Sequence, residues 1–385
     1  WRISEENFFK VDFVDNLKLR ASWGQLGNQE IDDYLFYDTY SFGYDYSFGN
    51  TLFSGISIND VMANSAITWE KTDQIDVGID ADFWGGKLSF TGDFFLKNTH
   101  AILLKLPMPD LIGVDAPMQN AGKVRNTGFE LALTHRNQLN LFKYSASFNF
   151  SYVKNEITDL NGGDIPGRSV GDPVDNIYGY VCEGIFRTQE EIDNSCSQIW
   201  GAVPGDLKYA DINNDNVVDQ SDRISLGSTF PKINFGLRLN CEYRNFDLTM
   251  LMQGAGMVKG VTAGEISQAF MNGGKVTEEW LDRWTPNNIN ASYPRLTLSS
   301  SSRNYMTSSF WVQNASYLKM RNLQIGYTIP KHLLTNWGIS NLRLYCSIDN
   351  LFTITNFKGL DPEMVTSSTL YPLTRNYSFG VNLSF

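Results

Sequence analysis

The sequence predicts an all-β fold, namely the wall of an antiparallel transmembrane β-barrel with long extracellular loops. The C-terminal segment 377–385 gives the first indication, because apolar residues alternate there with Ser, Gly or Asn. A period of two places one kind of side chain on each face of a strand. The second indication is that long and short connections alternate along the chain, as in barrels with short periplasmic turns and long outer loops. No segment approaches the ~18 uninterrupted apolar residues of a spanning helix, which excludes a helical membrane protein.

About ten clear strands follow from this alternation. In one of them Phe235, Leu237 and Leu239 alternate with Asn, Gly and Arg. The predicted strands are 17–24, 75–83, 88–96, 129–133, 144–152, 233–244, 246–252, 323–329, 342–348 and 377–385. For the charged residues on their polar faces, a solvated barrel wall is the favoured interpretation. These residues are Asp76, Asp80, Asp93, Arg238, Glu242 and Arg343.

The connections between the predicted strands alternate in length. Short links are expected at 84–86, 136–140, 244–245 and 330–339, and long ones at about 27–67, 99–119, 154–230, 254–313 and 353–370. A periplasmic C-terminus requires an outer loop before the last strand, and 353–370 meets that condition. Aromatic residues such as Trp84, Phe142 and Trp337 lie near the short turns, where barrels carry girdles at the lipid headgroups. The alternative is a soluble β-sandwich, but its strands are usually ~5–6 residues long and its loops do not alternate.

Composition restricts the function classes. The net charge of −11 argues against nucleic acid as a partner. With 14% aromatic and only 19% charged residues, a disordered chain is excluded. The sequence has no Walker loop, no G-x-S-x-G elbow and no Cys/His zinc pattern, so an enzyme is not expected. The chain starts at Trp1 rather than Met, and we therefore expect a processed or truncated piece of an exported protein.

The four cysteines are too few and too scattered for a disulfide framework. Cys182 and Cys196 fall in one loop region, and their spacing leaves both a bridge and two free thiols open. Cys241 and Cys346 lie on the apolar faces of predicted strands, where cysteine acts as a small hydrophobe.

An Asp/Asn-rich loop, residues 205–223, contains the one pattern with metal chemistry. Six potential oxygen ligands stand at relative positions 1, 3, 5, 7, 9 and 12, the spacing by which an EF-hand-type loop surrounds Ca²⁺. They are Asp211, Asn213, Asp215, the Val217 carbonyl, Asp219 and Asp222. Position 6 is Asn216, which tolerates the left-handed backbone that Gly usually supplies. A structural Ca²⁺ that stiffens this loop is favoured over the alternative, an acidic turn stabilised by its own Asx hydrogen bonds.

Several motifs, in order along the chain, carry a family likeness. They are LKLRASWGQLGN (17–28), WEKT (69–72), NAGKVRNTGFE (120–130), IYGYVCEGIF (177–186), GD (205–206), WTP (284–286), YLKMRNLQIGY (317–327), LDPE (360–363) and the aromatic terminus. In this order and spacing, the chain resembles the C-terminal part of the barrel of SusC-like (RagA-like) TonB-dependent outer-membrane transporters of Bacteroidetes.

The resemblance implies parts that the strand pattern does not contain. Such transporters have about 22 strands, a plug inside the barrel, a TonB-contacting segment before the plug, and a SusD-like lipoprotein over the outer mouth. Residues 1–385 would then be the C-terminal portion of the barrel, with the plug and the earlier strands outside this chain. The expected width of the barrel supports this. A closed barrel of ~8 strands is already filled by its own side chains, so one of about ten strands would leave little passage for an oligosaccharide. Dimers of transporter–lipoprotein pairs are also implied.

A second candidate site is an aromatic-rich loop that topology places outside the cell. Its tyrosines are Tyr34, Tyr37, Tyr40, Tyr44 and Tyr46. Packing of these rings against neighbouring loops, the plug or the lipoprotein lid is favoured over direct ligand contact. Two short helical stretches, Thr188–Asp193 with a Thr188/Glu191 capping box and Thr277–Trp284, are expected in the long loops.

The resemblance implies active import of a large nutrient, a glycan or oligopeptide, through the outer membrane, energised by TonB. The alternative is a secreted calcium-binding β protein that binds carbohydrate without transport. The two differ in the environment of one apolar stripe, which includes Phe235, Leu237, Phe379 and Val381. These side chains face outward to lipid in a transporter and inward to a core in a secreted protein.

Overall fold

The structure is a computed structural model of the whole chain. It describes residues 1–58, 61–106, 108–109, 111, 115–163, 165, 167–299, 302–366, 371 and 373–385. The expected outer loops 99–119 and 353–370 therefore lie partly outside the described residues. Among the residues described, no helix has the length and apolar character needed to span a bilayer.

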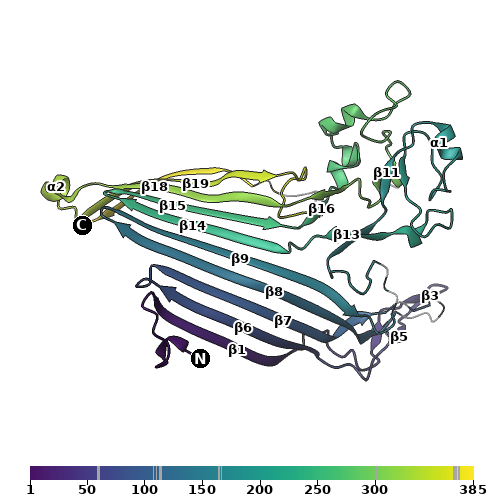
Figure 1. Cartoon of the computed structure of the whole chain (residues 1–385). Helices are drawn as coiled ribbons and strands as arrows, with labels where there is room; N and C mark the ends of the chain where they lie inside the picture. Colours follow the sequence, from purple (N-terminus) through teal and green to yellow (C-terminus); the bar gives the residue numbers. More distant parts are fainter. Residues whose placement is uncertain are drawn as a thin grey trace.

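One antiparallel, ten-stranded sheet forms most of the molecule, and its strands curve side by side across Figure 1. In spatial order they are β1 (Val14–Asn28), β6 (Glu70–Phe83), β7 (Leu88–Lys105), β8 (Met118–Leu139), β9 (Phe142–Asp159), β14 (Ile233–Tyr243), β15 (Phe246–Gly256), β18 (Tyr317–Thr328), β19 (Asn341–Thr355) and β20 (Asn376–Ser384). Spatial order follows chain order, so every connection joins neighbouring strands. All predicted strands are present. Among the described strands of this sheet, β1 pairs with β6 alone and β20 with β19 alone, so these two strands form its edges.

Short turns gather at one end of the sheet and long connections at the other (Figure 1). Trp84, Asn140 and Arg244 take left-handed backbone conformations in three of the short turns. The expected link 136–140 shrinks to two residues, because β8 stays paired with β9 as far as Leu139. The link between β18 and β19 carries the helix α2 (Lys331–Leu334). The predicted alternation of connection lengths is thus confirmed.

The sheet has one apolar and one polar face. Leu237 pairs with Phe148 and Met252, and such apolar rows cross the sheet from strand to strand. The residues next to these along each strand form polar rows, which lie on the opposite face of the sheet. At the C-terminus Phe379 is 82% and Val381 61% exposed, so this stripe is not buried in a core. The arrangement contradicts a β-sandwich and fits a wall whose apolar face meets lipid.

Several strands extend well beyond the predicted segments. β8 contains 22 residues, or ~70 Å at ~3.3 Å per residue, whereas a tilted bilayer needs only ~9–11 residues. Hydrophobic alternation ends where a strand leaves the membrane. Beyond that point polar residues such as Arg125 and Asn126 occupy both faces, and the pattern gives no signal.

The long connections form a folded layer of their own at the outer end of the sheet (Figure 1). Five pairs of short strands build it. They are β2 (Tyr40–Phe42) with β5 (Ile56–Ile58), β3 (Tyr46–Phe48) with β4 (Thr51–Phe53), β10 (Asn176–Gly179) with β13 (Ile224–Ser228), β11 (Cys182–Ile185) with β12 (Leu207–Tyr209), and β16 (Lys259–Val261) with β17 (Val312–Asn314). The three clusters of buried apolar side chains identified in the described part of the chain all lie in these connections.

Both predicted short helices are present in this layer. The helix α1 (Gln189–Asp193) begins after Thr188, whose hydroxyl accepts a hydrogen bond from the Glu191 N–H. The second stretch is a 3₁₀ helix, Glu278–Asp282, rather than an α-helix. Its Trp280 is buried against Trp311 in one of the three apolar clusters.

Candidate functional site

The polar face of the sheet is organised by ion pairs that span three strands. Arg20 on β1 contacts Asp80 on β6 (Nε to Oδ2, 2.8 Å) and Asp93 on β7 (Nη2 to Oδ1, 2.8 Å). The arginine reaches β7 by crossing over Gly78, since a Cβ there would collide with both Arg20 and Asp93. Strand pairing thus places the predicted polar-face residues Asp80 and Asp93 beside a partner that sequence reasoning did not identify.

The same arrangement recurs on the polar face towards the opposite edge of the sheet. Arg343 on β19 crosses Gly326 on β18 and binds Asp247 on β15, with Nε 2.8 Å from Oδ1. Two residues on strands that are separated by a third strand have no local sequence signal. A glycine on the polar face, flanked in both neighbouring strands by opposite charges, would have been the only clue.

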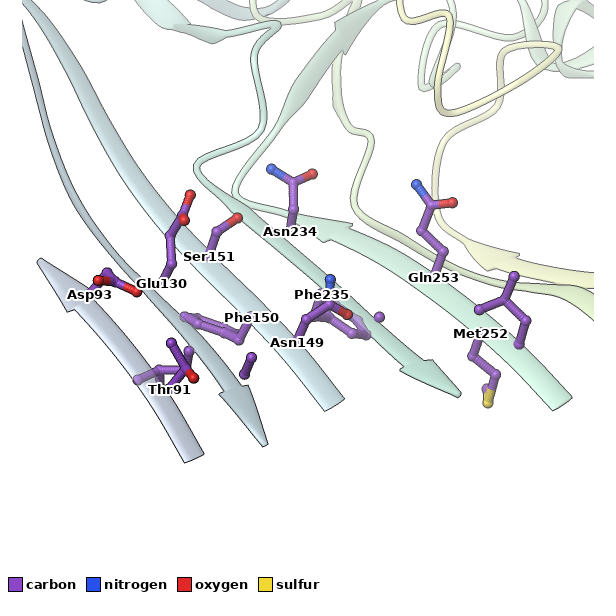
Figure 2. Close-up of a pocket in the computed structure, with 14 residues that line it drawn as sticks. Thr91, Asp93, Glu130, Asn149, Phe150, Ser151, Asn234, Phe235, Met252 and Gln253 are labelled. Atoms are coloured by element: carbon purple, nitrogen blue, oxygen red, sulfur yellow. The ribbon is translucent and has the colours of Figure 1, made fainter. Parts of the chain in front are cut away.

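Beside Asp93 the polar face is hollowed into a cavity of about 550 Å³ (Figure 2). Glu130, Ser151, Asn234 and Gln253 project to one side of the sheet, and Met252 projects to the other. Carboxylate and amide groups in such a row offer both donors and acceptors to a polar chain. The arrangement supports binding along the wall.

The Asp/Asn loop has the backbone of a tight, side-chain-stabilised turn. Asp211 accepts hydrogen bonds from the N–H groups of Asn214 (2.7 Å) and Asn216 (2.7 Å). Asn216 has φ +68°, the left-handed conformation expected at position 6. Asp222 is fully buried, and its carboxylate accepts from the N–H groups of Ile212 (2.7 Å) and Asp219 (2.8 Å).

These contacts bear on the predicted Ca²⁺. The spacing and the Asn216 backbone fit a metal loop, and Asp211, Asn213 and Asp215 would supply oxygens that stiffen it. Asp222, in contrast, is turned towards backbone amides, as in the alternative of an acidic turn. Over the residues that could be described, no three His, Cys, Asp or Glu side chains are grouped to hold a metal. Calcium binding stays a prediction.

The tyrosines of the aromatic loop lie on and around the hairpins β2–β5 and β3–β4. Tyr34, Tyr37, Tyr40 and Tyr46 are each about two-thirds exposed, and Tyr44 about half exposed. The ring contacts found here are between sequence neighbours, such as Phe36 with Tyr37 at 4.3 Å. The structure therefore presents the tyrosines outward, and their contact with a ligand or a lid stays a proposal.

Cys182 and Cys196 are free thiols that pack on one apolar cluster with Leu207 and Tyr209. Burial raises the pKa of the Cys182 thiol to about 11, which leaves it protonated and unreactive at neutral pH. Of the two alternatives left open by the spacing, the structure has the unbonded one.

Comparison with known proteins identifies the wall. The family model "TonB dependent receptor-like, beta-barrel" matches residues 7–351. The chain belongs to this family. The family is located in the outer membrane, so the short turns are periplasmic and the loop layer is extracellular. Comparison with individual proteins gives the sequence identity and the share of each chain that is covered.

The TonB-dependent receptor P3 of Formosa agariphila is 28% identical over the whole chain and 41% of its own length. The TonB-dependent receptor SusC of Bacteroides thetaiotaomicron is 28% identical over the whole chain and 39% of its length. The solved structure of the RagAB peptide transporter superposes with a TM-score of 0.80 at 25% identity, over the whole chain and 42% of that protein. The chain thus spans about two-fifths of these relatives and matches their C-terminal part.

Proposed function

We propose that this TonB-dependent receptor wall belongs to an importer of a large nutrient, a glycan or an oligopeptide. One observation carries the proposal, namely a two-faced sheet whose polar face is hollowed beneath a folded layer of loops. Glu130, Ser151 and Asn234 line this hollow and offer donors and acceptors to a polar solute. The similarity to the RagAB peptide transporter supports transport, with peptides as one class of solute.

The residues of this chain would bind and guide rather than react. The exposed tyrosines Tyr34, Tyr37, Tyr40, Tyr44 and Tyr46 would contact the solute or a SusD-like lipoprotein closing over the loops. A solute released inward would meet the carboxylates and amides of the polar wall. Energy would come through TonB, acting on a plug domain that we place outside residues 1–385. Pairs of transporter and lipoprotein would associate as dimers.

Import is tested in the native bacterium with the gene deleted and then restored. Uptake of fluorescently labelled oligosaccharides and oligopeptides should fall to background in the deletion strain and return on complementation. An uncoupler that collapses the proton gradient should abolish uptake without changing surface binding. Uptake of one labelled class that persists in the deletion strain would remove that class from the proposal, and persistence of both would refute import.

The lipoprotein partner is tested separately by affinity purification from outer membranes. A SusD-like lipoprotein should co-purify with the intact protein in mild detergent. Replacing Tyr37, Tyr40 and Tyr46 together by Ala should weaken either this association or solute binding. If neither changes, the tyrosines have neither role.

A further inference from the structure

The loop layer contains a second cavity, remote from the polar wall and of opposite charge character. Its volume is about 370 Å³. It lies between the turn around Trp200 and the segment that runs from Arg295 to Arg303. We call it the arginine pocket, and its residues are Trp200, Gly201, Ala202, Val203, Asp206, Arg295, Thr297, Ser299, Ser302 and Arg303.

One buried carboxylate organises the pocket. Asp206 is 2% exposed, and its Oδ1 accepts hydrogen bonds from Arg295 Nε (2.5 Å) and Asn304 Nδ2 (2.9 Å). Its Oδ2 accepts from the Val203 N–H at 3.1 Å. Arg295 is thereby held through Nε, while about a third of its side chain is exposed. Within the described part of the chain, no hydrogen bond reaches its two terminal nitrogens.

A second guanidinium forms part of the pocket lining. Arg303 is 4% exposed and donates to three neutral acceptors, the Gly201 carbonyl (2.6 Å), Gln198 Oε1 (2.6 Å) and the Leu207 carbonyl (3.0 Å). Its Nε is buried and has no hydrogen-bond partner among the residues that the structure describes. Burial lowers the pKa of Arg303, because a charge removed from water is costly unless an opposite charge compensates it.

The pocket thus has a surplus of positive charge in a chain whose net charge is −11. Two guanidinium groups, those of Arg295 and Arg303, line the cavity, and among its described lining residues Asp206 carries the one carboxylate, which binds Arg295. An anion beside Arg295 would compensate this surplus. The free end of a guanidinium is also a planar fork that matches the two oxygens of a carboxylate or sulfate.

An aromatic surface borders the same cavity. Trp200 is 71% exposed although it is a large apolar side chain. Its φ is +57°, a strained conformation for a bulky residue that persists only where the surroundings impose it. Here Arg303 holds the adjacent Gly201 carbonyl and so fixes the turn that displays the indole. Thr297 and Ser302 add hydroxyl groups to the lining.

We propose that the arginine pocket binds an acidic sugar, a saccharide unit that bears a carboxylate or sulfate group. The guanidinium of Arg295 receives the oxyanion, and the indole of Trp200 covers a face of the sugar ring. The indole and the hydroxyl groups of the pocket favour a sugar as the ligand. A peptide carboxylate would need only the arginine. The inference rests on the proposed import of a nutrient, because it assigns an acidic group to the imported solute.

The test is calorimetric titration of the purified full protein in detergent, at fixed ionic strength. The probes are sodium glucuronate and glucose 6-sulfate, with glucose as the neutral control and N-acetyl-dialanine as a peptide carboxylate. The two acidic sugars should bind at least about tenfold more tightly than glucose. Arg295→Gln should remove that difference, Arg295→Lys should restore part of it, and Trp200→Ala should weaken both acidic sugars.

Each outcome decides the inference. Equal binding of glucuronate and glucose, or an unchanged affinity in Arg295→Gln, would overturn it. Binding of N-acetyl-dialanine as tight as that of glucuronate would also overturn the assignment to sugars. Glu183→Gln, at the Lys208 ion pair outside the pocket, is the matched control and should leave binding unchanged. Import is measured separately, so bound probe without uptake contradicts only the transport proposal, and uptake without probe binding contradicts only the pocket.

Discussion

Two glycines on the polar face of the sheet leave room for ion pairs between the strands on either side of them. At Gly78 and again at Gly326, an arginine of one strand crosses the glycine to reach an aspartate two strands away. A side chain in the middle strand would occupy the path of the guanidinium. These ion pairs therefore tie three strands together through side chains, in addition to the backbone ladder.

Replacing Gly326 by Ala should destabilise the folded wall. Its Cβ would overlap both Asp247 Oδ1 and Arg343 Nη2, so the ion pair must move or break. We expect a loss of about 1–3 kcal/mol, as for overpacking elsewhere. Urea unfolding in lipid vesicles measures it. Gly24→Ala on β1 is the control, because no neighbouring atom lies within 4 Å of its Cβ position, and an equal loss in both variants would contradict the steric argument.

A buried charge cluster gives the last outer loop a dependence on pH. Lys319 is 2% exposed and contacts Asp361 (2.7 Å) and Glu363 (2.8 Å), and Arg321 also contacts Glu363. Burial alone would raise the pKa of Glu363, but hydrogen bonds from Lys319 and Tyr317 and the nearby positive charges outweigh it and lower the pKa.

Acidification should therefore release this loop. A carboxylate with a lowered folded-state pKa contributes its full stabilisation above its ordinary pKa of 4.5 and loses it as the pH falls through the folded-state value. Hydrogen exchange of residues 356–366, corrected for intrinsic rates, should accelerate as the pH falls below the ordinary glutamate pKa of 4.5. In Glu363→Gln the same loop should exchange faster at neutral pH, and its exchange should depend less on acidification. If the exchange rates of this variant follow pH as those of the unaltered protein do, the transition belongs to other groups.

At the scale of single elements, the Asp/Asn loop is the part whose stability depends on conditions outside the protein. Its turn is closed by side-chain oxygens that accept backbone N–H groups, with Asp211 and Asp222 as the principal acceptors. The same oxygens, apart from those of Asp222, are the ones that a calcium ion would take. The loop is therefore closed by its own side chains, and its stiffening by calcium is a prediction.

Calcium should protect this loop if the ion binds. Protease cleavage within 205–223 is expected to slow several-fold with millimolar Ca²⁺ and to recover after chelation, because ordering a loop reduces its local opening. The double variant Asp211→Asn/Asp215→Asn should cleave at one rate with or without Ca²⁺. Identical rates for the unaltered protein in both conditions would leave the acidic turn as the correct interpretation.

At the scale of the whole molecule, the sheet separates two environments by the alternation of its side chains. Adjacent residues in the middle of β18 illustrate it. Leu323 pairs with Met250 and Ile348 on the apolar face, and Gln324 pairs with Thr249 and Ser347 on the polar face. A charge placed at these two positions should meet lipid in one case and water in the other.

Leu323→Arg should impair folding into a membrane far more than Gln324→Arg. An arginine on the lipid face near the bilayer midplane costs about 2–4 kcal/mol, whereas the polar face is hydrated. The folded fraction in lipid vesicles can be followed by the electrophoretic shift on heating. Similar losses in the two variants would show that the apolar face does not contact lipid.

The sequence was sufficient for whatever depends on local alternation. It predicted the strands, the two faces, the alternating connections and the apolar-face position of Cys346, since each follows from neighbours in the chain. It did not predict the Arg20–Asp93 contact, which joins residues on strands separated by β6, nor the arginine pocket, which two different loops build. The outer ends of β8 and β9 were also missed, because polar residues occupy both faces there. The outer end of β7 was missed for another reason, because residues 101–104 form a continuous apolar run beside a register shift and do not alternate.

The distribution of buried apolar clusters has a thermodynamic consequence. Side chains of the wall turn their apolar surface outward, so the hydrophobic contribution to its stability comes from the surrounding lipid or detergent. The loop layer instead buries Leu207, Tyr209 and Trp280 in its own clusters, as a water-soluble domain does. Heating in detergent should thus give two calorimetric transitions. Changing the detergent should shift the transition of the wall and leave that of the loop layer in place.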